Sequence, residues 1–157
     1  DITYLWTKEG WLYLAAVLDL FSRRVVGWSM SKHLRTELIK DALNMAMKRR
    51  QPKAELMHHS DRGSQYASTN YQNTLKKLGI KISMSRKGNC WDNAVMERFF
   101  GSLKSERTDF KKYENREQAK ADVIDYIEMF YNSERLHSTL DYMSPLQYEK
   151  KHSALFC

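Results

Sequence analysis

The 157 residues are enough for one ordinary domain. With 42% hydrophobic and 29% charged residues, the composition is that of a globular protein and excludes a disordered chain. The longest apolar stretch, 11–18, is far shorter than the roughly 20 residues that cross a bilayer. Two cysteines, Cys90 and Cys157, cannot build a disulfide framework or a four-ligand zinc site on their own, so we expect a reduced, cytoplasmic compartment. The net charge of +7 favours a polyanionic partner.

The first thirty residues predict three strands joined by short turns. Residues 1–6 alternate and carry β-branched and aromatic side chains. Residues 11–20 are dense in apolar side chains, as in a central strand, and residues 24–30 complete the meander. We expect the aromatic residues of this region to lie in the core: Trp6, Trp11, Tyr13 and Trp28.

Helices and two further short strands follow. Thr36 is expected to cap a helix that ends before Pro52, residues 55–59 to form a fourth strand and residues 80–84 a fifth. Between these strands, the helical spacing of Tyr71, Leu75 and Leu78 predicts a helix that Gly79 ends.

The last third of the chain predicts two long helices and a tail. Asp92 is expected to cap a helix that runs to about residue 109. Asn115 and Gln118 form a capping-box pattern for the next helix, whose apolar face includes Phe130. In the tail, Ser144-Pro145 indicates a turn or the start of a short helix. The order of elements predicts an α/β fold with a five-stranded mixed sheet, an antiparallel meander of three strands plus two parallel strands, flanked by helices.

Three acidic residues stand out by their location. Asp1 lies on the first strand, Asp61 follows the end of the fourth strand, where α/β sheets collect ligands, and Glu97 lies on the helix after the fifth strand. Carboxylates without a His or Cys partner favour Mg²⁺ or Mn²⁺ over zinc, and a pair of such ions suits phosphoryl transfer. The residues alone leave an alternative open, in which Asp1 is a frayed end, Asp61 a turn former and Glu97 a surface residue.

Several blocks along nearly the whole chain carry a family resemblance. They are 1–4 (DITY), 18–28 (LDLFSRRVVGW), 59–66 (HSDRGSQY), 92–100 (DNAVMERFF), 103–106 (LKSE), 131–140 (YNSERLHSTL) and 144–145 (SP). In these blocks the chain resembles the integrase catalytic core of bacterial insertion-sequence transposases of the two-reading-frame type, which are related to retroviral integrases. The 35 residues between Asp61 and Glu97 match the characteristic spacing of that family.

The resemblance implies a ribonuclease-H-like fold and a metal triad of Asp1, Asp61 and Glu97 that holds two Mg²⁺ ions, with Mn²⁺ as a substitute. It implies cleavage that frees a 3′-hydroxyl at the element end, followed by strand transfer through direct transesterification. The expected partners are terminal-repeat DNA, target DNA and further copies of the chain, in the cytoplasm and nucleoid of a bacterium and away from membranes. Residues 1–157 would form the catalytic core, with 132–157 as a C-terminal extension packed on it and an upstream DNA-binding region absent.

Four basic residues beside the triad are candidate DNA contacts. Lys104 shares the helix face of Glu97 and is expected to hold a phosphate. Arg62, Arg86 and Lys87 lie in loops that flank the site, where ordinary surface solubility is the alternative.

Three further residues belong to the candidate DNA site. Asn93 could orient Glu97, hold a metal-bound water or cap the helix. The family motif places Arg135 and His137 near DNA or as braces of the last helix. Two other functions stay open: a catalytically incompetent fragment that binds DNA or self-associates, and a simple metal-dependent nuclease of the same fold.

Overall fold

The computed structural model describes residues 1–53 and 55–153, except for the side chains of Cys90 and Trp91. The prediction for the two cysteines, Cys90 and Cys157, therefore lies outside the described side chains. The strands are β1 (Ile2–Thr7), β2 (Gly10–Leu18), β3 (Val25–Ser31), β4 (Met57–Ser60) and β5 (Lys81–Met84). The helices are α1 (Thr36–Arg50), α2 (Ser64–Ala67), α3 (Thr69–Lys77), η1 (Cys90–Asn93), α4 (Ala94–Leu103), η2 (Lys104–Thr108), α5 (Arg116–Ile124), η3 (Asp125–Tyr131), η4 (Ser138–Leu140) and α6 (Pro145–Lys151). Within the described ranges, no helix has the length and apolarity of a membrane span.

The five strands form two sheets. The antiparallel meander β1-β2-β3 and the parallel pair β4-β5 confirm the predicted strand pairings. The expectation of one continuous five-stranded sheet is wrong for the described residues. β1 pairs with β2 along one edge. Where β1 ends, its other edge contacts a later segment of the chain: Thr7 forms a β-bridge with Tyr113, and the backbone N–H of Lys8 donates to the carbonyl of Tyr113 at 3.0 Å.

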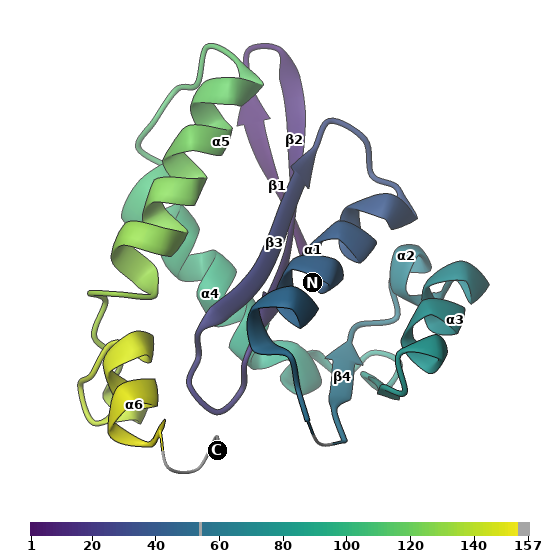
Figure 1. Ribbon diagram of the computed structural model, residues 1–157. Helices are drawn as coiled ribbons and strands as arrows, with labels where there is room; N and C mark the ends of the chain where they lie inside the picture. The colour runs from purple at the N-terminus through teal and green to yellow at the C-terminus, as the bar shows by residue number, and fades with distance from the viewer. Residues whose placement is uncertain (54, 154–157) are drawn as a thin grey trace.

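Helices cover both faces of the meander (Figure 1). On one face α1 packs against β2 and β3, and on the other α4, α5 and η3 enclose a core around Leu12, Leu14 and Phe99. The approach of α1 to β3 depends on Gly27. A Cβ at Gly27 would overlap the carbonyl oxygen of Ala42 and lie 2.9 Å from the backbone nitrogen of Ala46, so only glycine fits without a shift of the helix.

The aromatic residues of the meander are only partly in the core. Trp28 packs against the core, and its indole N–H donates to Glu128 at 2.8 Å. Tyr13 is partly buried beside α1. Trp6 and Trp11 are 60% and 46% exposed, so the core prediction was wrong for both. They lie edge to face at 4.9 Å on neighbouring strands, at the end of the sheet that α1 does not reach.

Two predicted helix caps are wrong. Thr36 is the first residue of α1, and the capping position is Arg35, whose side chain makes no cap hydrogen bond. Asp92 instead accepts hydrogen bonds from the backbone and guanidinium of Arg86. The cap at Asn115 is confirmed, because its side chain accepts from the backbone N–H of Gln118 at 2.8 Å.

The long helices change their winding, which changes the residues they bury. α4 continues as the π-helical turns of η2, and α5 continues as those of η3. A π-helix has more residues per turn, so the inward face of η3 moves from the predicted Phe130, which is partly buried, to Tyr131, which is 3% exposed. In the shorter helix α3, Tyr71 is buried but Leu78 is 44% exposed, because the chain leaves the helix at Gly79 with a φ of 69°.

The C-terminal helix α6 contacts the β2–β3 turn and α1. Its start at Ser144 has a complete capping box, which confirms the predicted helix start. Glu149 accepts hydrogen bonds from Ser22 and Arg24 and pairs with Arg50 at the end of α1. Figure 1 shows α6 at the end of the sheet where this turn lies.

Candidate metal and DNA site

The first candidate carboxylate, Asp1, is held by strand pairing. Its backbone exchanges two hydrogen bonds with Ala16 of β2, at 3.0 and 2.9 Å, so the β1–β2 ladder extends to this residue. One side-chain oxygen, Oδ1, accepts from the backbone N–H of Ile2 at 2.7 Å. The other, Oδ2, accepts from the amide of Asn93 at 2.6 Å. The ladder and these two bonds fix the position of the carboxylate.

The second carboxylate, Asp61, lies directly after β4. Its Oδ1 accepts from the backbone N–H of Gly63 at 2.8 Å, in a turn so tight that a Cβ at Gly63 would lie 2.9 Å from that oxygen. The negative charge of Asp61 acts on the backbone nitrogen of Asp1. Asp61 therefore lies within electrostatic reach of the start of β1.

The third carboxylate follows Asn93 on α4. Asn93 occupies the helix-capping position, but its side chain makes no cap hydrogen bond, so the capping alternative is wrong. It donates to Asp1 instead and ties the start of α4 to the first strand. Glu97 lies about one helical turn later and is exposed. Within the described part of the chain it makes no hydrogen bond or ion pair.

The three carboxylates are not gathered into a closed cluster. Among the described residues, no three Asp, Glu, His or Cys side chains lie close enough to hold a metal ion. The structure connects Asp1 to α4 and places Asp61 near the same strand, while the Glu97 side chain points into solvent. The donor atoms are nevertheless those that Mg²⁺ prefers, because all three groups offer carboxylate oxygens. The site residues fit magnesium by donor chemistry.

The neighbouring histidines are engaged elsewhere. His58 Nε2 shares a hydrogen bond of 2.9 Å with the hydroxyl of Tyr71. His59 lies on the opposite side of β4, where its two ring nitrogens contact Ser83 and Ser85 at 2.8 and 3.2 Å. Three of these four ring nitrogens, which as ligands would favour zinc, are thus engaged in other hydrogen bonds, and the fourth, His58 Nδ1, is buried without a partner.

The loop residues predicted to contact DNA differ in their surroundings. Arg62 donates from Nε to the carbonyl of Ser85 at 2.6 Å, which fixes the guanidinium against the residue that follows β5. Arg86 pairs with Asp92 at 3.3 Å, although its side chain is 77% exposed. Lys87 is exposed and makes no ion pair within the described residues.

Lys104 lines a cavity other than the one that Arg98 lines. It is seven residues beyond Glu97, about two helical turns, and this cavity of about 590 Å³ also includes Tyr4, Trp6 and Lys112. Its contact with a DNA phosphate stays a prediction.

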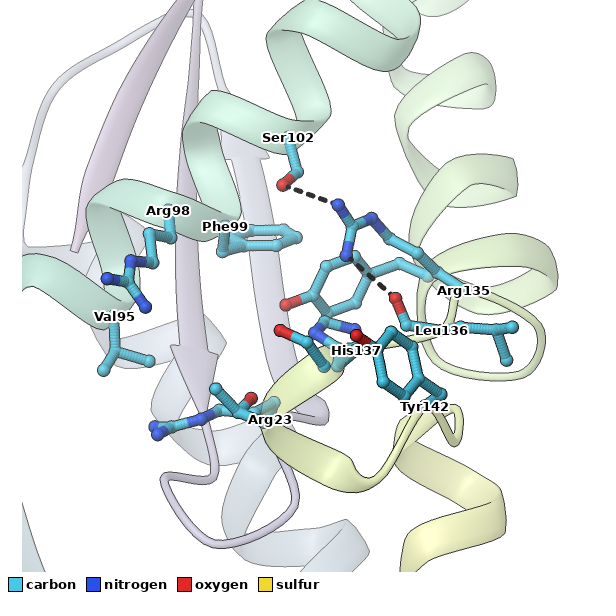
Figure 2. A pocket seen from close by; sticks show the side chains of 12 residues that line it. Arg23, Val95, Arg98, Phe99, Ser102, Arg135, Leu136, His137 and Tyr142 are labelled. Atoms are coloured by element: carbon cyan, nitrogen blue, oxygen red, sulfur yellow. Dashed lines mark hydrogen bonds between the residues drawn. The ribbon is translucent and has the colours of Figure 1, made fainter.

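Arg135 and His137 both have structural partners. Arg135 donates to Glu106 at 2.7 Å. It also donates to Ser102 at 3.3 Å, as Figure 2 shows. Burial raises the pKa of Glu106, but hydrogen bonds from Arg135 and Tyr126 outweigh it and leave the pKa below its usual value. The backbone N–H of His137 donates to Met143 at 3.1 Å, and burial lowers the pKa of its imidazole to about 4. Both the DNA contact and the bracing of the last helix stay predictions for these two residues.

Sequence reasoning missed three residues. Asn132 is buried and forms hydrogen bonds to both backbone polar groups of Val25. Arg23 and Arg98 line a cavity on the flank of α4. Asn132 lies within the block 131–140 and Arg98 directly follows Glu97, so both sit inside motifs. Arg23 lies within the block 18–28, so it too sits inside a motif.

Comparison with known proteins agrees with the fold and the motifs. A sequence profile described as integrase core domain matches residues 1–90, and a second profile of the same description matches residues 97–152. The chain is 48% identical over 153 residues to the transposase for insertion sequence element IS904 of Lactococcus lactis, which covers 98% of this chain and 60% of that protein. It is 50% identical over 154 residues to transposase InsF for insertion sequence IS3A of Escherichia coli, which covers 98% of this chain and 54% of that protein. The chain thus spans little more than half the length of these relatives.

Solved structures give the same fold at low sequence identity. The HTLV-2 integrase catalytic core domain in complex with magnesium matches with a TM-score of 0.70 and 18% identity, over 94% of this chain and 91% of that one. The BIV integrase catalytic core domain matches with a TM-score of 0.65 and 16% identity, over 99% and 96%. The α/β fold is that of retroviral integrase catalytic cores, the ribonuclease-H-like fold expected from the resemblance. With a family profile matching more than half of its length, the chain belongs to the integrase core domain family.

Proposed function

We propose that this chain is the catalytic core of a DNA transposase, with Asp1, Asp61 and Glu97 as its metal-binding carboxylates. The observation that carries the proposal is the 2.6 Å hydrogen bond from Asn93 to Asp1. It ties the first-strand carboxylate to the start of the helix that carries Glu97, so carboxylates far apart in the sequence belong to one region. The similarity to insertion-sequence transposases at 48% and 50% identity supports the same function.

The proposed reaction has two steps at phosphorus. In the first, water attacks a phosphodiester at the element end, the bond to the 3′-oxygen breaks, and a 3′-hydroxyl is freed. In the second, that hydroxyl attacks a phosphodiester of target DNA, one bond to phosphorus forms and another breaks, and the strands are joined. When bound, divalent ions supply Lewis-acid activation and charge neutralisation for such displacements. The carboxylates hold the ions, Asn93 fixes the rotamer of Asp1, and Arg62 contributes positive charge beside Asp61.

The cofactors, partners and location follow from the reaction. We propose two Mg²⁺ ions, replaceable by Mn²⁺, because two ions can stabilise both the attacking and the leaving oxygen. The DNA partners are the terminal repeats and the target, contacted by Lys104, Arg86 and Lys87. At least two copies of the chain act together, because two element ends are joined. The setting is the bacterial cytoplasm, at the nucleoid, and residues 132–157 act as an extension that braces the core.

The test combines a joining assay with matched variants. The chain is incubated with Mg²⁺ or Mn²⁺, a labelled duplex that already ends in a 3′-hydroxyl, and plasmid target. A joined product that is lost in Glu97→Gln and kept in Glu117→Gln is expected, because Glu117 is an exposed residue of α5 with only a surface partner, Lys120. Nicks without joined product would indicate a nuclease. DNA binding with neither product would indicate a non-catalytic module, and both results contradict the proposal.

A further inference from the structure

A cavity of about 460 Å³ lies on the flank of α4 (Figure 2). Most of its lining comes from three segments that are far apart in the sequence, the β2–β3 turn, α4 and the loop 135–142, and Tyr131 of η3 completes it. Its volume is in the range of small-molecule sites. Arg98 lines it from α4 and directly follows Glu97 in the sequence, so one helix carries residues of both the cavity and the candidate carboxylate site.

The lining of this cavity is basic and contains no carboxylate among the described residues. Arginine side chains come from all three segments: Arg23 from the turn, Arg98 from the helix and Arg135 from the loop. Arg135 is neutralised by its ion pair with Glu106. Within the described part of the chain, the side chains of Arg23 and Arg98 form no ion pair or hydrogen bond. Two uncompensated positive charges therefore face one cavity.

The backbone holds part of this lining in an unfavourable conformation. Among the described residues, four that are not glycine have positive φ, and two of them, Arg23 at 61° and Tyr142 at 57°, line the cavity. Glycine, asparagine or aspartate usually occupies such positions. The β2–β3 turn fixes Arg23 by hydrogen bonds of 2.8 and 2.9 Å that Asp19 makes with Arg23 and Arg24. Strain of this kind concentrates at binding and catalytic sites.

The Arg23 charge acts on two other residues of the lining. It lowers the pKa of both Tyr131 and His137, although burial is the main influence on each. The His137 ring packs edge to face on Tyr131 at 5.1 Å, and both line the cavity. The hydroxyl groups of Ser138 and Thr139 also line it and make no hydrogen bond within the described residues.

We propose that this cavity binds a phosphate of the DNA backbone next to the one at the carboxylate site, with Arg98 and Arg23 as its charged contacts. The hydroxyl groups of Ser138 and Thr139 are the neutral donors. The inference rests on the proposed function, since DNA is the substrate there. The cavity would be a second contact point for the DNA, in addition to the carboxylate site. A DNA strand held in the cavity would then pass over the face of α4 that carries Glu97. Guanidinium groups suit this role because they donate several N–H bonds in a fixed plane to phosphate oxygens.

The test is the salt dependence of duplex DNA binding, measured by fluorescence anisotropy in Ca²⁺ so that cleavage does not interfere. Each phosphate contact contributes about 0.9 to the slope of log K against log salt. Arg98→Gln and Arg23→Asn are each expected to reduce the slope by about 0.9 and to weaken binding roughly tenfold. Asparagine tolerates the positive φ at position 23, and circular dichroism checks the fold of each variant. Arg98→Lys keeps the charge and is expected to keep the slope.

A matched control separates a local contact from net charge. Lys77→Gln removes one exposed positive charge on α3, away from the cavity, and is expected to leave the slope unchanged. If Arg98→Gln and Arg23→Asn keep the wild-type slope, or if Lys77→Gln reduces it equally, the cavity proposal is overturned while the proposed function stands. If the chain binds no DNA, both are overturned.

Discussion

Asn132 substitutes for a neighbouring strand at the edge of β3. Its side-chain oxygen accepts from the backbone N–H of Val25 at 2.9 Å, and its amide donates to the carbonyl of Val25 at 3.0 Å. The residue is 1% exposed, so water cannot replace these bonds. In Asn132→Ala both backbone groups lose their partner, at a cost of about 1–3 kcal/mol each. We expect a loss of about 4 kcal/mol in the free energy of unfolding, which lowers the melting temperature by roughly 8–16 °C.

Urea and thermal unfolding followed by tryptophan fluorescence measure this loss. Asn44→Ala is the control, because Asn44 is exposed on α1, and its free energy of unfolding should change by less than about 0.5 kcal/mol. Asn132→Asp should be destabilised at pH 7, where its carboxylate faces the carbonyl of Val25, and less so as the pH falls. Burial raises the pKa of this carboxyl in the folded state, so the protonated form, which can donate, stabilises the fold only at low pH. A loss below about 1 kcal/mol in Asn132→Ala would refute the role of these two bonds.

Three more predictions concern packing, titration and the metal site. Gly27→Ala should lower the free energy of unfolding, measured in urea, by about 1–3 kcal/mol, because the new methyl group clashes with α1. Gly101→Ala, at an open helix position, should raise it by about 0.5–1 kcal/mol. Equal effects of the two substitutions would contradict the close packing of Gly27 on α1. The ring signals of His137 should titrate in NMR spectra with a pKa of about 4. In the unfolded state this imidazole takes up its proton at the ordinary pKa of about 6.5, so the free energy of unfolding should fall as the pH drops from about 6.5 to 4. A pKa near 6.5 in the folded protein would contradict the burial of His137. Asn93→Ala frees the Asp1 carboxylate and should raise the Mg²⁺ concentration for half-maximal nicking about 10- to 100-fold, and an unchanged requirement would count against its positioning role.

The sequence predicts the strands and helices well where their patterns are local. The alternation of β1, the helical spacing in α1 and the cap at Asn115 depend on neighbouring residues, and each prediction agrees with the structure. Local patterns could not predict the exposure of Trp6, because it depends on how much of the sheet α1 covers, which is a matter of tertiary packing. The change from Phe130 to Tyr131 on the inward face has a similar cause, since the π-helical turn follows from tertiary packing.

The candidate site shows the same division. The positions of Asp61 and Glu97 are marked by spacing and motif, so sequence alone selects them. The relation of Asp1 to the Glu97 helix depends on the bond between Asn93 and Asp1, which joins residues 92 positions apart. A pattern in one sequence cannot show such a contact. The cavity with Arg23 could not be predicted either, because three distant segments form it.

The central claim is that three carboxylates share divalent ions. Crystals soaked in Mn²⁺, with anomalous diffraction recorded near the manganese edge, test it directly. The account predicts anomalous peaks bonded to oxygens of Asp1, Asp61 and Glu97 at about 2.0–2.2 Å, and their loss in Asp61→Asn. Peaks bound to other residues, or none beside Asp61 in crystals that hold Mn²⁺ elsewhere, would contradict it.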